Sequence, residues 1–469
     1  MQCKTVRICA RPCFFRSCRL ERTPVNASVA SCSSSPAPDP AALATRPTLA
    51  AWLEEYAAIE REWMEGLATY GIDFAPRDED AAAVAVLRER LRAKGARFRN
   101  GGASVSVGRI SSACLACTGD RGSRSFFLSL QCNRSCYFCF NVNQEDYEQN
   151  RRLKPGWRDE VDAYLAAPDA PTHAALTGGE PLLHKPEAEE FFRRIHDAAP
   201  DVHLRLYTAG DFLDESAARA LRDAGLQEMR LSVKLGDGPE SDRVAIEQAL
   251  ATLALAREVI PDVMVEMPVI PGTEDALRAL LRGMDSLGLF GINLLEFCYP
   301  YGDWEEYRRR GFKVKNPAFA VLYDYGYAGG LPIAGSERAC LELVEWALDE
   351  GLSLGVHYCS LDNKNRDQIL QASLAAAPSV DEELCQLDDG DFFYRALKVF
   401  DGDAPVARER LREAGVPFAE NDEDGSLAVH PAHRALLDGL AVARSVNVAQ
   451  PDGPAGTWRL RELKLEYPA

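Results

Sequence analysis

Short apolar segments alternate with amphipathic segments from about residue 125 onward, and this alternation restricts the fold more than any other feature of the sequence. The apolar segments have the length and composition of buried strands, and the amphipathic segments have the apolar spacing of helices. The predicted strands cover 126–130, 174–177, 203–207, 229–233, 263–270, 292–297 and 353–357. The predicted helices lie near 157–167, 186–198, 214–224, 241–258, 274–287 and 337–350. Such alternation implies right-handed βαβ units and a parallel sheet.

Six strand–helix repeats fit a full or partial (β/α) barrel, in which the active site lies at the carboxyl ends of the strands. The predicted fold class is therefore α/β, with a partial (β/α)6 barrel over residues 125–375 as its core. A small α+β domain is predicted over residues 380–469. Its expected strands are 392–400, 426–429 and 458–467, and its expected helices are 404–414 and 432–440. This domain carries no motif that indicates chemistry.

The part of the chain before the barrel divides into two regions. Residues 49–124 are predicted to be helical, because apolar side chains recur three or four residues apart from Trp52 to Tyr70 and a second helix is expected over 79–94. Residues 1–48 carry six Arg or Lys residues and one acid, Glu21, before a Ser/Ala/Pro run. This composition resembles an organellar transit peptide. The alternative is a disordered tail that results from an upstream start codon.

Composition and charge exclude several classes of partner. A formal net charge of −18 opposes binding to a phosphate backbone, so no nucleic acid is expected. The sequence contains no run of about 18 or more apolar residues, so no membrane span is expected. Five of the 14 cysteines lie before residue 33 and five lie between 114 and 139. Such clustering indicates metal ligation in a reducing compartment. We therefore expect a cytoplasmic protein, or a protein of an organellar matrix if the tail is a transit peptide.

Three cysteines follow the first predicted barrel strand directly: Cys132, Cys136 and Cys139. Three thiolates in one short loop can bind three irons of a [4Fe–4S] cluster and leave the fourth iron without a protein ligand. That open iron can chelate the amino and carboxylate groups of a small molecule. Tyr137 and Phe138 would shield such a cluster. A zinc site is the alternative, but closed zinc sites need a fourth ligand and usually use paired Cys-x2-Cys units.

A Gly-Gly-Glu-Pro turn, Gly178, Gly179, Glu180 and Pro181, follows the second predicted strand. Two glycines let the backbone approach a ligand closely, and the Glu180 carboxylate can receive an ammonium group. The alternative is an ordinary loop. A shared site requires that this turn and the cysteine loop open at the same end of the fold.

The spacing Cys-x3-Cys-x-aromatic-Cys, with a Gly-Gly-Glu turn one βα unit later, resembles the radical S-adenosylmethionine (SAM) superfamily. Segments 291–297 and 356–360 resemble an uncharacterised family within it that is related to pyruvate formate-lyase activating enzymes. The resemblance spans about 126–469 and implies a barrel of the radical SAM type, with SAM bound between the cysteine cluster and the Gly-Gly-Glu turn. It also implies that the reduced cluster cleaves SAM to a 5′-deoxyadenosyl radical, which abstracts a substrate hydrogen.

The resemblance also implies SAM contacts at the ends of the later strands. Thr208 and Ser232 would offer polar contacts, Lys234 would meet the ribose or carboxylate, and Ile270 would border the adenine. Glu296 would contact substrate or ribose at the barrel mouth. The alternative for each is an ordinary strand end, and for Glu296 it is a surface charge or a paired structural acid.

A second group of cysteines surrounds the barrel strands in the sequence. Cys114 and Cys117 form a Cys-x2-Cys pair before the first strand, and Cys359 follows the last. If the barrel brings these ends together, the three thiols can ligate an auxiliary iron–sulfur cluster or zinc, with Cys298 or Cys340 as a fourth ligand. The alternative is a set of free thiols or a redox dithiol.

These features predict a radical SAM enzyme, an oxidoreductase related to activating enzymes, whose substrate is unknown. A peptide or protein substrate competes with a small molecule, and the C-terminal domain favours the former because it could serve in recognition. The expected partners are SAM and an electron donor such as flavodoxin or ferredoxin. The alternative class is a non-catalytic iron–sulfur electron-transfer protein or a zinc-binding protein.

Overall fold

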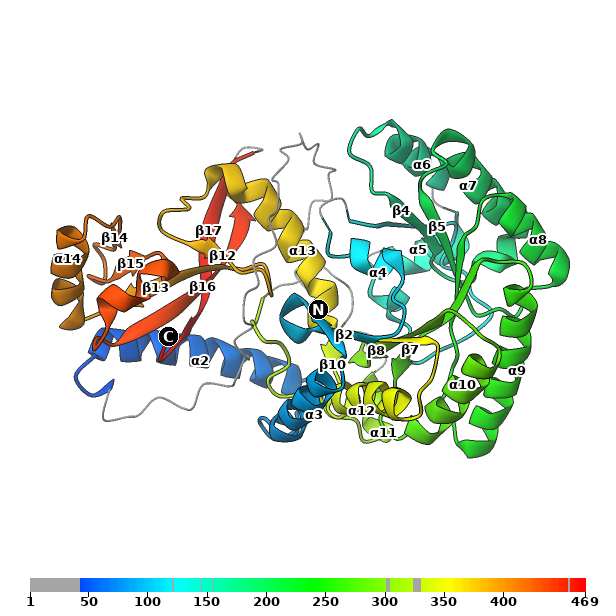
Figure 1. The fold of residues 1–469 in the computed structure, drawn as a ribbon, viewed down its shortest axis with the longest axis horizontal. Coiled ribbons are helices and arrows are strands. Elements are labelled where there is room, and N and C mark those ends of the chain that lie inside the picture. Colours follow the sequence, from blue (N-terminus) through cyan, green and yellow to red (C-terminus); the bar gives the residue numbers. More distant parts are fainter. Residues whose placement is uncertain are drawn as a thin grey trace.

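The computed structural model describes residues 43–119, 122–144, 146–154, 156–300, 304–323, 330–453 and 456–469. The predictions for residues 1–42 lie outside this part of the chain. Two sheets organise the described residues, a nine-stranded sheet and a smaller sheet near the C-terminus. Figure 1 shows the two sheets at opposite ends of the molecule, with α13 (Leu361–Ala376) between them.

Seven strands of the larger sheet are parallel, and their order in the sheet follows their order in the chain. They are β3 (Arg124–Phe127), β4 (His173–Thr177), β5 (His203–Thr208), β6 (Glu228–Leu231), β7 (Asp262–Val269), β8 (Gly291–Glu296) and β11 (Gly355–Cys359). The helices that connect or follow them are α5 (Tyr147–Arg152), α6 (Trp157–Ala166), α7 (Lys185–Ala198), α8 (Glu215–Asp223), α9 (Pro239–Arg257), α10 (Glu274–Ser286) and α12 (Ser336–Asp349). Because β3 stands at one edge, the barrel stays open. The predicted α/β class with a partial barrel is confirmed, and β11, the strand predicted over 353–357, pairs in parallel with β8.

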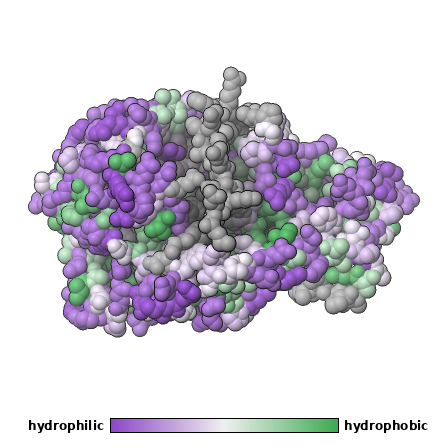
Figure 2. All heavy atoms as spheres, turned by 180° about the vertical axis from the view of Figure 1, so that it is seen from behind, coloured by the Kyte–Doolittle hydropathy of each residue, from purple (hydrophilic) through white to green (hydrophobic). Residues whose placement is uncertain are grey.

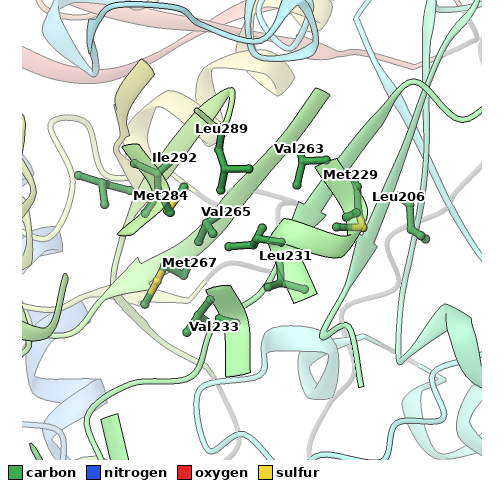
Figure 3. Packing of buried hydrophobic residues seen from close by; sticks show 14 of the residues in the cluster. Leu206, Met229, Leu231, Val233, Val263, Val265, Met267, Met284, Leu289 and Ile292 are labelled. Atoms are coloured by element: carbon green, nitrogen blue, oxygen red, sulfur yellow. The ribbon is translucent and has the colours of Figure 1, made fainter. Parts of the chain in front are cut away.

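The two faces of this sheet have opposite character. Successive side chains of a strand point to opposite faces, and one set is apolar and packs against the helices. Figure 3 shows this packing for side chains that include Leu206, Met229, Val265 and Ile292, together with Met284 of α10. The intervening residues are largely polar, as in the Glu-Met-Arg-Leu sequence of β6. We call the face opposite the helices the lumen face.

Two short antiparallel strands extend the sheet beyond β11, and sequence analysis missed them. They are β1 (Arg97–Arg99) and β2 (Ser104–Val107), and β2 pairs with β11. Neither strand contains an apolar run, because Arg and Ser alternate with the apolar residues, so neither is distinctive in the sequence. The predicted second helix is confirmed as α3 (Ala81–Ala93), which packs against α12.

The C-terminal sheet has the order β14-β15-β13-β16-β17, with β12 paired to β13. Its elements are β12 (Gln386–Leu387), β13 (Tyr394–Val399), α14 (Asp403–Glu413), β14 (Ala419–Glu420), β15 (Leu427–Val429), η5 (Pro431–Leu437), β16 (Val442–Pro451) and β17 (Trp458–Glu466). The predicted helix over 432–440 is wrong in type and extent, since a 3-10 helix ends there at Leu437. Gly439 then takes a positive φ of 82° and leads into β16, which lies between β13 and β17 and which the sequence analysis missed.

Helix α2 (Pro47–Ala68) joins the two ends of the molecule, as Figure 1 shows. Its first half packs through Leu49, Trp52 and Tyr56 against the C-terminal sheet. Its second half packs through Trp63 and Leu67 beside the barrel mouth, near the pair β9 (Cys298–Tyr299) and β10 (Leu331–Pro332) and the helix α11 (Trp304–Arg309). The predicted apolar stripe is therefore a packing surface over most of its length, although Ile59 and Tyr70 are exposed.

No helix among the described residues is long and apolar enough to cross a bilayer. The face drawn in Figure 2 is mainly hydrophilic, with hydrophobic residues in small separate groups.

Candidate functional site

The cysteine triad lies in the long loop after β3, at the carboxyl end of the parallel strands. Cys132 is exposed, Cys136 and Cys139 are partly buried, and burial raises the pKa of all three thiols. In the described part of the chain, no three His, Cys, Asp or Glu side chains converge closely enough to hold a single metal ion. The ligands of a four-iron cluster bind different irons and need not converge on one point. Three thiols in one loop are a donor set that fits such a cluster.

The triad loop is tied to the end of β5 by an acidic residue that the sequence analysis missed. Asp211 Oδ2 accepts hydrogen bonds from Arg134 Nε at 2.8 Å and from Asn133 Nδ2 at 2.7 Å. Arg134 and Asp211 also form an ion pair. The position of Asp211, directly after a strand end, was the available signal.

The Gly-Gly-Glu turn lies directly against this loop. The backbone N–H of Gly179 donates to Ser129 O at 3.0 Å, and that of Glu180 donates to Gln131 O at 2.8 Å. The loop that carries the cysteines and the turn after β4 therefore open at the same edge of the sheet, as a shared site requires.

Both glycines are needed for this close contact between two stretches of backbone. A Cβ atom at Gly179 would lie 2.0 Å from Gln131 O, and one at Gly178 would lie 2.5 Å from Phe127 Cβ. Gly178 also has a φ of 106°, which L side chains rarely adopt. The predicted reason for the glycines was approach to a ligand, whereas the contact in the structure is with the segment that leads into the triad.

The Glu180 carboxylate is engaged inside the protein. It is 2% exposed and accepts hydrogen bonds from Thr208 Oγ1 and Ala209 N, both at 2.7 Å, and from Leu182 N at 3.0 Å. Burial raises the pKa of Glu180, and these three donors oppose the rise. Glu180 thus joins the ends of β4 and β5, and Pro181 begins the 3-10 turn η3 (Pro181–His184) that follows.

Of the other strand-end residues, Ser232 and Lys234 are the most accessible. Ser232 is exposed and follows β6, and Lys234 Nζ lies 2.7 Å from Asp237 Oδ2. The Lys234 charge acts on Cys136, where it opposes the rise in the pKa of the thiol that burial causes. Thr208 differs from both, because its hydroxyl donates to Glu180 and accepts from Gly210 N at 2.9 Å.

Aromatic side chains form one wall of the triad loop. Phe138 lies edge-on to Tyr137 and to Phe297, with ring centroids 5.1 and 6.2 Å apart, and Ile270 belongs to the same buried cluster. The Arg310 guanidinium lies 4.3 Å from the centre of the Tyr137 ring. These contacts place Phe138, the residue before Cys139, in the same apolar layer as Ile270.

Glu296 has the geometry of a paired structural acid, which was the alternative to a contact with substrate or ribose. It lies on the same face of β8 as Ile292 and Leu294, the face that packs on helices. Its carboxylate lies 2.7 Å from Lys315 Nζ and accepts from Leu361 N at 2.8 Å, at the start of α13. Burial raises the pKa of Glu296, and Lys315 opposes the rise. The predicted contact at the barrel mouth would require the opposite face.

The lumen face carries a buried polar network that the sequence analysis missed. Arg230, 3% exposed, lies 2.5 Å from both Glu228 and Glu266, and Glu266 accepts from Asn293 Nδ2 at 2.7 Å. His357 is hydrogen-bonded to Asn293 Oδ1 at 2.9 Å, and burial lowers the pKa of His357 to about 3. The strict alternation of polar and apolar residues in β5 and β6 was the signal for this network.

The second group of cysteines adjoins this network. Cys114 lies in α4 (Ser112–Ala116) and Cys117 at its end, while Cys359 ends β11. Cys340 is fully buried among apolar side chains of α12, on the helix side of the sheet, and Cys298 lies in β9. The described cysteines form no disulfide with one another.

Comparison with known proteins identifies the barrel. A family model described as "Radical SAM superfamily" matches residues 127–282. A protein of Methanocaldococcus jannaschii, provisionally named a glycyl-radical enzyme activating enzyme, is 26% identical over 324 residues, which are 67% of this chain and 81% of that protein. The GTP 3',8-cyclase of Nautilia profundicola is 28% identical over 175 residues, 36% of this chain and 49% of the cyclase, so the chain spans about half of that relative.

Among solved structures, SuiB of Streptococcus suis bound to the precursor peptide SuiA matches with a TM-score of 0.37 and 13% identity, over 59% of this chain and 52% of SuiB. The family match covers the cysteine triad, the Gly-Gly-Glu turn and strands β4 to β7. Residues 127–282 are therefore a radical SAM domain.

Proposed function

We propose that the protein binds one [4Fe–4S] cluster through Cys132, Cys136 and Cys139 and cleaves SAM reductively beside the turn formed by Gly178 and Gly179. The observation that carries this proposal is the direct backbone contact between the cysteine loop and the turn. A ligand that chelates an open iron at the triad would lie within reach of the turn. When bound, the reduced cluster supplies the electron that breaks the C5′–S bond of SAM and gives the 5′-deoxyadenosyl radical.

The residues of the chain would hold and orient these groups. Arg134 and Asp211 fix the triad loop on the end of β5, and Glu180 fixes the turn through Thr208. Glu180 and Thr208 thus serve as positioning residues, and the methionine ammonium would meet backbone carbonyl groups of the turn. The wall that contains Phe138 would exclude water from one side of the cluster.

Ser232 and Lys234 are the accessible side chains proposed to contact SAM. The hydroxyl of Ser232 is exposed, and the charge of Lys234 already acts on Cys136. An ammonium group in that position suits the SAM carboxylate. Ile270 would border the adenine from the apolar layer.

We infer that the substrate is a peptide or protein, from which the radical abstracts a hydrogen atom. The name of the Methanocaldococcus relative supports this class, because an activating enzyme acts on another enzyme. The C-terminal sheet offers a separate unit for recognition of a macromolecule. A small-molecule substrate is the second candidate, and the named GTP cyclase supports it. The electron donor would be a flavodoxin or ferredoxin in a reducing, cytoplasmic compartment.

Anaerobic reconstitution of the full chain with iron and sulfide, followed by dithionite and SAM, tests the proposal. We expect 5′-deoxyadenosine from the parent protein and none from a Cys136→Ala variant. A matched Cys385→Ala variant changes a buried cysteine of the C-terminal region and should behave as the parent does. An intact cluster without SAM cleavage would overturn the proposal in favour of an electron-transfer protein, and one zinc per chain without sulfide would favour a zinc-binding protein.

A further inference from the structure

Sulfur atoms from distant parts of the chain accept side-chain hydrogen bonds on or beside the lumen face. Cys114 Sγ accepts a hydrogen bond from Asn293 Nδ2 of β8 at 3.1 Å and from an Arg230 nitrogen of β6 at 3.5 Å. Cys359 Sγ accepts from Asn363 Nδ2 at 3.3 Å. Side-chain N–H groups that donate to sulfur are the environment of metal-bound thiolates, since such bonds stabilise charge on the sulfur.

The three thiols lie close enough to act on one another and on one cation. Burial lowers the pKa of the Arg99 guanidinium, and the charges of Cys114, Cys117 and Cys359 oppose that lowering. Burial raises the pKa of Cys359 to about 12, and the charges of Cys117 and Cys114 add to the rise. Burial likewise raises the pKa of Cys117, with Cys114 among the groups that add to it. Hydrogen bonds link the same elements: Asn363, which donates to Cys359 Sγ, accepts from Asn100 Nδ2 at 2.7 Å, and Asn100 Nδ2 also donates to Thr118 Oγ1, next to Cys117, at 3.0 Å. We call the space beside these contacts the chamber.

This chamber is rich in fixed positive charge. The charges of Arg205 and Lys364 act on Cys117, that of Lys364 acts on Cys359, and Arg230 contacts Cys114 directly. Acids lie in the same region, because Arg230 is paired with Glu228 and Glu266 and the charge of Asp367 also acts on Cys117. N–H donors and cations beside the sulfur atoms would stabilise the charge of metal-bound thiolates.

The two remaining barrel cysteines are Cys298 and Cys340. The Cys340 thiol faces Leu295 O on the helix side of β8, among apolar side chains. Cys298 lies in β9, where Lys364 and Glu296 act on its thiol. Cys298 or Cys340 as a fourth ligand stays a prediction, and the proposal below concerns the other three cysteines.

We propose that Cys114, Cys117 and Cys359 bind a second iron–sulfur cluster on the lumen face of the barrel. Three thiolates around one chamber suit a cluster, whose ligands bind different irons. Lys364 lies between the two cysteine groups, since its Nζ is 5.7 Å from the Phe140 ring centre, beside Cys139, and its charge acts on Cys117 and Cys359. The second cluster would therefore face the same reaction space as the first.

The test uses the full chain with Ser at Cys3, Cys9, Cys13, Cys18 and Cys32, so that the N-terminal cysteines bind no iron. A variant that also carries Ala at Cys132, Cys136 and Cys139 is reconstituted with iron and sulfide under anaerobic conditions. We expect it to keep about half of the parent's iron and sulfide, with charge-transfer absorbance and an electron paramagnetic resonance signal after reduction.

The converse variant, Cys114→Ser/Cys117→Ser/Cys359→Ser, should lose the same amount of iron while its triad still cleaves SAM. Cys298→Ala and Cys340→Ala serve as matched controls and should keep the full amount. The proposal is overturned if the first variant is folded by circular dichroism but holds no iron, or holds zinc without sulfide, or if the converse variant keeps the parent's iron. Failure of SAM cleavage in the converse variant, with half of the iron retained, would count against the function of the triad and not against the second cluster.

Discussion

The two groups of barrel cysteines differ in how the fold holds them. Cys132, Cys136 and Cys139 occupy one loop at the mouth, and this loop is positioned by backbone contact with the turn after β4. Cys114, Cys117 and Cys359 come from α4 and from β11, and they are surrounded by buried charged and amide side chains of the strands. The mouth site therefore depends on close backbone packing at two glycines, whereas the lumen site depends on a balanced set of buried charges.

The two sites should therefore respond differently to substitutions. A buried charge that loses its partner is costly anywhere in the fold, because the remaining charge is desolvated and unpaired. A backbone contact fails when a side chain is forced between its two partners, and the effect is local. Changes at the lumen should therefore affect stability as well as the second cluster, and changes at the mouth should affect SAM cleavage with little loss of stability.

The largest effect is expected at Arg230. Arg230→Met leaves the buried carboxylates of Glu228 and Glu266 without their cation, which should lower the free energy of unfolding by about 3–5 kcal/mol. Urea denaturation measures the change. Arg243→Met removes an Arg that is also paired with two acids, but on the exposed face of α9, and should leave stability unchanged. Equal effects of the two substitutions would contradict the view that the lumen face depends on buried charge.

A smaller effect, confined to the mouth, is expected at Gly179. Gly179→Ala places a Cβ atom 2.0 Å from Gln131 O and must displace the segment that leads into the triad. SAM cleavage should fall by about a hundredfold, because catalysis is lost when reacting groups move by about 1 Å. Gly402→Ala, a position with no atom within 4 Å of the added Cβ, should leave the rate unchanged. A Gly179→Ala enzyme with the parent's rate would show that the backbone contact does not position the site.

The same difference explains what could be predicted from the sequence. The triad and the Gly-Gly-Glu turn are short contiguous motifs, and the rule that parallel strands end at one edge was enough to bring them together. Asp211, Arg230 and Asn293 act through partners that lie far away in the sequence, so no local pattern assigns those partners. The helix-side location of Glu296 follows from the register of β8, which periodicity alone places only to within a residue or two.

Acid should reveal a further difference between the two sites. Burial alone would raise the pKa of Glu228, but the Arg230 guanidinium and hydrogen bonds from His203 and Ser111 hold this pKa well below its usual range. A carboxyl with a lowered pKa in the folded state contributes stability that is fully present above its unfolded pKa, about 4.3, and is lost as the pH falls below that value.

Glu228→Gln should therefore reduce the slope of unfolding free energy against pH below about pH 4.3, by up to about 1.4 kcal/mol per pH unit. Urea denaturation at several pH values between 5 and 3 measures the slope, provided that unfolding is reversible at each pH. Glu189→Gln, which changes an exposed acid of α7 paired with Arg193, should keep the slope of the parent. A variant of Glu228 with an unchanged slope would show that the acid sensitivity of the fold arises outside the lumen network.

The smallest effect is expected where the mouth loop is held by a partly exposed ion pair. Asp211→Asn keeps the size of the side chain but removes the charge opposite Arg134, and such pairs contribute less than about 1 kcal/mol. Loss of iron to a chelator should become a few-fold faster for the triad cluster and stay unchanged for the second cluster. Asp214 lies on the same loop after β5 as Asp211, and its charge is paired with Lys185 of α7. Asp214→Asn removes this comparable charge and should alter neither rate. If Asp211→Asn also releases iron faster from the lumen cluster, the two sites are coupled. In that case the mouth site does not depend on backbone packing independently of the buried charges that hold the lumen site.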